Sequence, residues 1–257
     1  MSAVTTEVWA GAVWARLERP EAMNSLNWDV LAGLERAMDE ALAADGVHAL
    51  VVTGTGRAFC AGADLEMLGG AEGDAFERFL AAVLATFRRL ELLPLPTVAA
   101  INGIALAGGL ELILCCDLAV ASADAKIGDA HANYGIVPGG GGTVRLARRV
   151  GPALAKRLMF TGDFLPAEEL RHSGLLNDIV ADEELESAVD ALVARFATKS
   201  PLGLALMKQL TDDALQAPLE VGLRAELVGA ALHARSADMA EGLAAFREKR
   251  TPKFTGQ

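Results

Sequence analysis

The chain has 257 residues, of which 52% are hydrophobic and 5% aromatic, so it can form one large domain with a core of mainly Ala, Val and Leu. Its formal net charge of −11 argues against nucleic acid or an anionic membrane as a partner. The three cysteines form no CxxC pair, which is typical of a reduced protein. No signal peptide and no membrane-spanning apolar stretch is apparent, and we expect a cytoplasmic protein.

The first half of the chain predicts alternating strands and helices. Residues 8–17 are expected to form a short hairpin, and Asn27 is placed to cap a helix over about 28–44. A second helix is expected over about 74–92, ended by the two prolines that follow it. Short apolar runs predict three buried strands, at 49–53, 97–101 and 118–121.

Two of these strands lead into turns rich in glycine and small residues. The first is followed by a turn at 57–64, and the second by residues 102–109 and a helical run at 110–115. Strands that feed such turns and then helices indicate an α/β core.

The second half is predicted to be mainly helical. Residues 135–142 are expected to form a loop, and 143–162 are helical in composition. From about residue 163 onward we expect five more helices, at 167–173, 182–198, 201–215, 218–234 and 236–247.

Two segments have residues suited to stabilising a negative charge. At 57–65, small residues let a ligand approach the backbone, although an ordinary tight turn has the same composition. At 101–112, a strand enters glycines that open a helix, whose N–H groups and positive dipole end suit a carboxylate or an enolate. Glu111 lies in the first turn of that helix among apolar neighbours, either as a base or as a residue that only satisfies the dipole.

Several other kinds of site are excluded by their missing patterns. Neither glycine cluster fits a Rossmann or P-loop fingerprint. The chain contains no GxSxG or HExxH motif, nothing suggests a serine-peptidase arrangement, and the four histidines lack metal-ligand spacing. We expect neither a metal nor a tightly bound cofactor.

Five segments in order resemble the enoyl-CoA hydratase/isomerase, or crotonase, family. Residues 18–27 (ERP followed by NSLN) resemble the family's opening motif, and 59–65 (FCAGADL) and 101–112 (INGIALAGGLEL) its two oxyanion segments. Residues 135–146 (GIVPGGGGTVRL) resemble its G-x-x-P-G-x-G-G-T-x-R-L motif, and 246–254 its C-terminal tail. The likeness covers nearly the whole chain.

The resemblance implies a crotonase-type α/β fold, in which residues 1–195 form a spiral of ββα turns. Residues 196–257 would form a helical C-terminal region that builds a homotrimer or a dimer of trimers. The substrate would be an acyl-CoA or enoyl-CoA thioester, so that coenzyme A enters as part of the substrate.

The resemblance also implies residue roles. The backbone N–H groups of Ala63 and Gly108 would form an oxyanion hole around the thioester oxygen, and Glu111 would be a catalytic base. Such donors stabilise an enolate where its charge develops, each by about 3–4 kcal/mol. The positions implied to contact coenzyme A are Arg57, Ala61, Asp64, Leu65, Phe246 and Lys249, the last two from the tail or from a neighbouring subunit.

The chain departs from the family pattern at the second catalytic glutamate. His131 stands at that position, and no glutamate occurs between Glu111 and Glu168. Three explanations are open. His131 replaces the glutamate as proton donor; Asp129, on the same side if the backbone is extended, contributes instead; or the enzyme uses one base. Otherwise His131 is only part of the pocket wall.

We therefore rank an enoyl-CoA hydratase first. An isomerase comes next, followed by another enolate-forming member of the family, such as a decarboxylase or hydrolase. A non-catalytic acyl-CoA-binding or RNA-associated homologue is the last alternative, since fold does not fix function. The acyl chain length depends on the helix around 66–92, where the sequence gives no answer.

Overall fold

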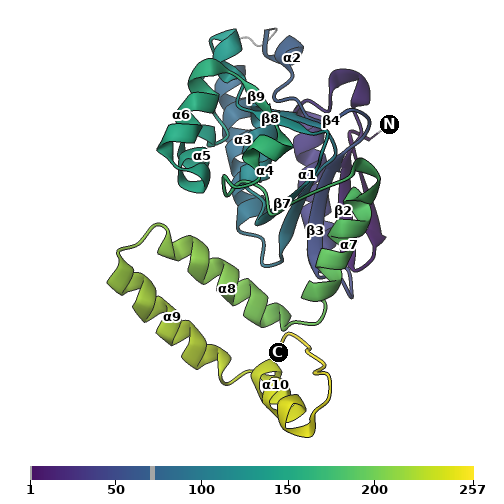
Figure 1. Ribbon diagram of the computed structural model, residues 1–257, viewed down its shortest axis with the longest axis vertical. Helices are drawn as coiled ribbons and strands as arrows, with labels where there is room; N and C mark the ends of the chain where they lie inside the picture. Colours follow the sequence, from purple (N-terminus) through teal and green to yellow (C-terminus); the bar gives the residue numbers. More distant parts are fainter. Residues whose placement is uncertain (1, 70–72) are drawn as a thin grey trace.

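The computed structural model describes residues 2–69 and 73–257 (Figure 1). The strands are β1 (Val4–Trp9), β2 (Ala12–Leu17), β3 (Ala49–Gly54), β4 (Ala58–Cys60), β5 (Thr97–Ile101), β6 (Ile104–Leu106), β7 (Leu118–Ser122), β8 (Lys126–Gly128), β9 (Phe164–Pro166) and β10 (Asp178–Val180). The α-helices are α1 (Trp28–Ala43), α2 (Leu65–Gly69), α3 (Ala75–Glu91), α4 (Gly108–Leu114), α5 (Gly142–Val150), α6 (Pro152–Thr161), α7 (Leu185–Phe196), α8 (Pro201–Ala214), α9 (Leu219–His233) and α10 (Ala237–Glu248).

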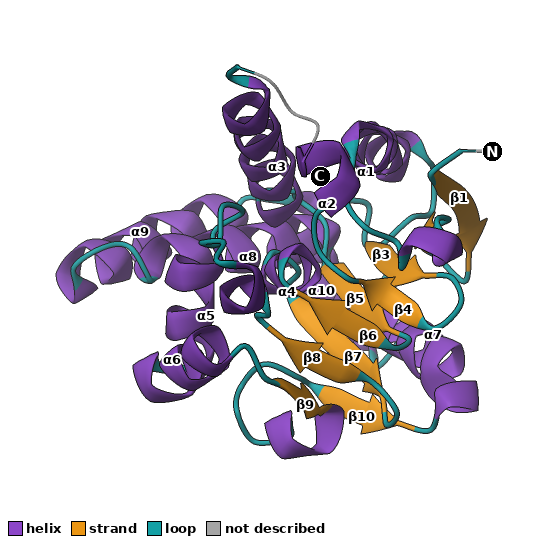
Figure 2. Ribbon diagram, turned by 90° about the horizontal axis from the view of Figure 1, so that it is seen from above, coloured by secondary structure: helices purple, strands orange, loops and turns teal. Residues whose placement is uncertain are grey.

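The strands form two sheets joined by a repeated path of the chain. One sheet has the order β1-β2-β3-β5-β7-β10 and the other β4-β6-β8-β9. Both are parallel except for the β1–β2 and β8–β9 pairs. Three times the chain leaves a strand of the larger sheet, adds the next strand of the smaller sheet and then enters a helix (Figure 2). This path is the predicted spiral of ββα turns.

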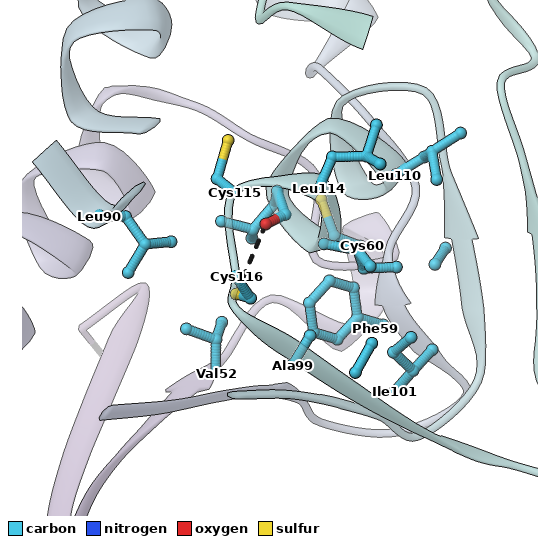
Figure 3. Packing of buried hydrophobic residues seen from close by; sticks show 14 of the residues in the cluster. Val52, Phe59, Cys60, Leu90, Ala99, Ile101, Leu110, Leu114, Cys115 and Cys116 are labelled. Carbon is cyan, nitrogen blue, oxygen red and sulfur yellow. Dashed lines mark hydrogen bonds between the residues drawn. The ribbon is translucent and has the colours of Figure 1, made fainter. Parts of the chain in front are cut away.

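The larger sheet is buried on both faces. Alternate residues point to opposite faces of a strand, so Leu50 and Val52 of β3 join the main core, while Ala49 and Val51 pack with α7. Figure 3 shows part of the main core, where Val52 lies near Phe59 of the smaller sheet. Burial on both faces explains why these strands are apolar runs without alternation.

Most predicted elements of the first half are confirmed. The hairpin turns at Ala10 and Gly11, both with positive φ, and the Asn27 side chain accepts a hydrogen bond of 2.9 Å from the Val30 N–H, as expected of an N-cap. The predicted turns at 57–64 and 102–109 are each interrupted by a three-residue strand, β4 and β6.

The second half differs more from its prediction. The segment 143–162, predicted to be helical, is helical but divided in two: α5 ends at Val150, and Gly151, with φ +78°, separates it from Pro152 at the start of α6. The helix predicted over 167–173 is only a 3₁₀ turn at 167–170. Strands β8, β9 and β10, of three residues each, were not predicted.

The last three helices form an arm that extends from the core (Figure 1). Lys208 of α8 joins it to the core, donating to Asp117 Oδ2 at 2.8 Å and to the Leu95 carbonyl at 3.1 Å. Asp238 at the start of α10 is buried and accepts hydrogen bonds from the backbone of Thr255 and Gly256, which holds the C-terminal tail. The division at residue 195 stays a prediction. None of the described helices has the length and hydropathy needed to cross a membrane.

Candidate active site

A cavity of about 240 Å³ lies where the two glycine-rich segments meet. Its walls come from the β4–α2 segment, α3, the start of α4 and residues 130–140. Two larger cavities lie along α8. We place the candidate site in the smaller cavity because, of the described residues, its walls alone combine Ala63, Gly108 and Glu111.

The backbone N–H groups of Ala63 and Gly108 are placed to act together. Leu26 pairs with this segment by donating to the Gly62 carbonyl at 2.7 Å and accepting from Asp64 N–H at 2.9 Å. The N–H of Ala63, between them, therefore points away from Leu26. Gly108 is the first residue of α4, so its N–H has no acceptor within the helix. A Cβ built on Gly108 would lie 3.5 Å from Ala63 N, so the two residues lie side by side in the cavity wall.

The backbone before Gly108 is strained. Ala107 has φ +50° and ψ −115°, a conformation that residues with a Cβ rarely adopt. Its N–H donates to the Gly128 carbonyl at 3.1 Å, which holds the turn in place. This turn ends β6 and starts α4 within one residue, and so directs the first N–H of the helix into the cavity.

Glu111 is a buried carboxylate that faces the same cavity from α4. Its side chain is buried, with the residue 3% exposed, and Oε1 accepts a hydrogen bond of 2.7 Å from Gly142 N–H. Burial raises its pKa, although the Gly142 and Gly140 amides and the nearby His131 oppose that shift. A carboxyl group with a raised pKa is suited to exchange a proton with a substrate.

His131, which lines the cavity, forms a pair with Asp129. His131 Nδ1 lies 3.1 Å from Asp129 Oδ1, and the same oxygen accepts from the His131 backbone N–H at 3.2 Å. The backbone is not extended here, since Ala130 has φ +59° and His131 starts a 3₁₀ turn. The pair instead forms because the turn folds the ring back over Asp129. Because Nδ1 of His131 contacts the Asp129 carboxylate, the other ring nitrogen, Nε2, remains available to contact a ligand.

The predicted catalytic and oxyanion residues are therefore close together, except that Asp129 itself does not line the cavity. Its Oδ2 is buried and has no hydrogen-bond partner in the described part of the chain. A buried carboxylate oxygen without a donor favours a positive charge nearby.

The residues predicted to contact coenzyme A divide into two groups. Ala61 and Leu65 line the cavity, and Arg57 is exposed at the start of β4. Asp64 is occupied within the chain, since its carboxylate bonds Arg19 at 2.8 Å and Met67 N–H at 3.2 Å.

The other two predicted contacts lie on the arm. Phe246, 83% exposed, and Lys249 are at the end of α10, which Figure 1 shows well apart from α2 and β4. One chain therefore does not bring them to its own cavity.

Sequence reasoning missed the residues that position the oxyanion segment. Asn24 is fully buried and bonds the Thr55 and Ala58 carbonyls at 2.9 and 2.7 Å. Arg19 donates to the Ser25 carbonyl at 2.7 Å as well as to Asp64. Both belong to the N-terminal motif at 18–27, which therefore holds Leu26 against the Ala63 segment. The sequence signal that could have identified Arg19 and Asn24 is that both are polar residues in a loop that has to be buried.

The chain is similar to proteins of one family over nearly its whole length. The family model described as "Enoyl-CoA hydratase/isomerase" matches residues 8–257. Crotonyl-CoA hydratase of Syntrophomonas wolfei is 37% identical over 93% of this chain and 92% of its own. 2,3-Dehydroadipyl-CoA hydratase of Escherichia coli is 38% identical, with 94% of each chain covered.

A relative named for a different reaction is similar to the same extent. 1,2-Epoxyphenylacetyl-CoA isomerase of E. coli is 36% identical over 100% of both chains. Among solved structures, an enoyl-CoA hydratase from Bacillus anthracis superimposes with a TM-score of 0.95 at 33% identity, covering 99% of this chain and 100% of that one.

Proposed function

Because the chain belongs to the enoyl-CoA hydratase/isomerase family, we propose that it adds water across the double bond of a 2-enoyl-CoA. Glu111 is assigned as the general base, and His131, held by Asp129, as the second acid–base group. Two acid–base groups on one cavity carry this proposal, because hydration moves one proton from water and delivers another to carbon.

The proposed reaction passes through an enolate. Glu111 takes a proton from water, the oxygen of that water bonds to the β-carbon, and the electron pair of the double bond moves onto the thioester oxygen. The Ala63 and Gly108 N–H groups stabilise that oxygen. The enolate then takes a proton at its α-carbon from protonated His131, and a proton transfer from Glu111 restores both groups.

The cavity favours an uncharged acyl group. Phe76, Phe79, Leu80 and Val83 of α3 line it, and none of its described lining residues is Lys or Arg. A second carboxylate on the acyl chain would be buried there with no Lys or Arg to pair with, which is unfavourable. We therefore propose a short, uncharged 2-enoyl-CoA such as crotonyl-CoA as the substrate.

The test is the loss of conjugated thioester absorbance with two substrates. We expect hydration of crotonyl-CoA, with kcat/KM at least about tenfold above that for 2,3-dehydroadipyl-CoA, which carries the extra carboxylate. Equal or reversed values would contradict an uncharged acyl site. Tight binding of crotonyl-CoA without hydration would favour an isomerase, the second candidate, because a single base suffices to move a proton between two carbons.

Replacing His131 by alanine is expected to lower kcat for hydration by about a hundredfold, since the α-carbon loses its proton donor. Exchange of the α-protons of butyryl-CoA with solvent deuterium should fall as well, because the group that protonates the α-carbon also removes its proton in the reverse direction. His172→Ala, at an exposed position, is the matched control. Unchanged hydration in His131→Ala would show that this side chain is only part of the cavity wall.

We also propose that the arm of α8–α10 associates with other copies to form a trimer or a dimer of trimers. It exposes large apolar side chains that a monomer rarely leaves in water: Leu215 (68%), Leu219 (74%), Leu227 (72%), Leu232 (62%) and Phe246 (83%). In such an assembly Phe246 and Lys249 would approach the coenzyme A of a neighbouring subunit. Sedimentation velocity would give the mass of the particle, and a monomer at micromolar concentration would contradict the assignment.

A further inference from the structure

Arg145 joins three parts of the fold just outside the active-site cavity. Its Nη1 donates to the Gly140 carbonyl at 2.7 Å. Its Nε and Nη2 donate to the two carboxylate oxygens of Glu91, at 3.1 and 2.9 Å. Glu91 is the last residue of α3 and also accepts from Arg88 at 2.6 Å. A two-point arginine–carboxylate pair of this kind is geometrically restrictive, so it fixes where the Gly140 carbonyl lies.

The same loop surrounds the carboxylate of Glu111. Gly142 N–H donates to Oε1 at 2.7 Å. A Cβ at Gly140 would lie 2.8 Å from Oε2, and one at Gly142 would lie 3.1 Å from Oε1, so a side chain at either position would press on the Glu111 carboxylate. Gly141 has φ +101°, and a Cβ there would lie 1.9 Å from Arg145 Nη1. Glycine at these positions therefore lets the loop approach Glu111 closely and leaves room for the guanidinium.

A loop of four glycines has no side chains of its own to fix it, and glycine loses more backbone freedom on ordering than other residues. The contacts from Arg145 supply an external restraint. We propose that Arg145, held by Glu91, is a positioning residue that keeps the Gly140 and Gly142 amides against the Glu111 carboxylate. Neither Arg145 nor Glu91 lines the substrate cavity in the described structure, so their effect on the reaction would pass through Glu111.

The proposal predicts a change in the protonation of Glu111. Amide donors favour the carboxylate and lower its pKa, opposing burial. The other titratable groups near Glu111 are His131 in the cavity wall, its partner Asp129, and Cys60 and Cys115 in the core. Burial raises the pKa of each of these two thiols to about 12, so they stay neutral. Loss of the loop restraint is therefore expected to raise the pKa of Glu111.

Two substitutions separate positioning from simple charge attraction. Glu91→Gln retains the positive charge of Arg145 and removes a negative charge near it. Charge attraction alone would then lower the pKa of Glu111, whereas a loosened loop would raise it. Arg145→Lys retains the charge but cannot form the two-point pair, so positioning again predicts a higher pKa. Arg148→Met, an exposed change on the same helix, is the control.

The experiment is a ¹³C NMR titration of the glutamate carboxyl groups, with the Glu111 signal assigned by its absence in Glu111→Gln. We expect the pKa of Glu111 to rise by about 0.5 to 1 in Glu91→Gln and Arg145→Lys and by more in Arg145→Met, and to be unchanged in Arg148→Met. The acidic limb of the plot of kcat against pH should shift together with the pKa of Glu111, while KM stays unchanged. A pKa that falls in Glu91→Gln, or that is unchanged in Arg145→Lys, would overturn the proposal.

The proposal builds on the function assigned to Glu111, but the titration needs no turnover. If the protein fails to hydrate crotonyl-CoA, only the proposed reaction is contradicted, and the NMR result still decides the role of Arg145. Thermal unfolding shows whether each variant is folded. Arg145→Lys, which can still contact the Gly140 carbonyl, keeps the test decisive if Arg145→Met does not fold.

Discussion

Glu111→Gln is expected to lower kcat for hydration of crotonyl-CoA by about a thousandfold, while the protein keeps its fold. Glutamine has the size of glutamate and can still accept the hydrogen bond from Gly142 N–H, but it cannot take a proton from water. Binding of a saturated acyl-CoA should change little, because the proton transfer belongs to the transition state. Stopped-flow absorbance and equilibrium binding measure the two quantities separately.

The same substitution has a second consequence, for stability. Burial raises the pKa of Glu111 in the folded state, so the folded protein binds this proton more readily than the unfolded chain. The free-energy cost of the buried charge is therefore present above the folded-state pKa and disappears as the pH falls through it. Glu111→Gln is expected to unfold at a higher temperature than the native protein at neutral pH, with a smaller difference in acid.

Glu168→Gln is the matched control for both measurements, since Glu168 is exposed and pairs only with Arg171 on its own turn in the described structure. It should leave kcat unchanged. A Glu111→Gln enzyme with full activity on crotonyl-CoA would remove Glu111 from the mechanism. The remaining candidates for the base would then be His131 and Asp129.

The fold was largely predictable where a cap residue or a long run of consecutive residues carries the signal. Helix α1 begins where its cap residue, Asn27, predicts, and the buried strand β5 is visible as five consecutive apolar or β-branched residues. The three-residue strands of the smaller sheet were not predictable, because three residues are too few to show a period and their pairing depends on partners far along the chain. The break between α5 and α6 is visible in the sequence as Gly151-Pro152.

The candidate site was predicted only in part, for a similar reason. Resemblance to the family gave Ala63, Gly108 and Glu111, and the position of His131 in the motif marked it for attention. The bond between His131 and Asp129 depends on a left-handed residue between them, which sequence spacing does not show. Arg145 and Glu91 are 54 positions apart, and nothing local to either residue indicates that they pair.

The proposed oxyanion hole of Ala63 and Gly108 leads to the second large expected effect. Gly108→Ala is expected to lower kcat by about a hundredfold, because an alanine Cβ would lie 2.8 Å from Leu26 Cδ1 and 3.4 Å from Gly62 Cα. Leu26 would have to move, and its backbone pairs with the segment that presents the Ala63 N–H. Misalignment of one oxyanion donor typically costs about 10²–10³ in kcat.

The loss should be larger in kcat than in the affinity for a saturated acyl-CoA, since the full negative charge on the thioester oxygen exists only in the enolate. Overpacking at this buried position is expected to destabilise the fold by about 1–3 kcal/mol, so kinetics are to be measured well below the unfolding temperature. Gly222→Ala is the control, because its Cβ would meet only Ala214 atoms at 3.5 Å or more. If Gly108→Ala weakened substrate binding and left kcat intact, Gly108 would shape the cavity without stabilising the enolate.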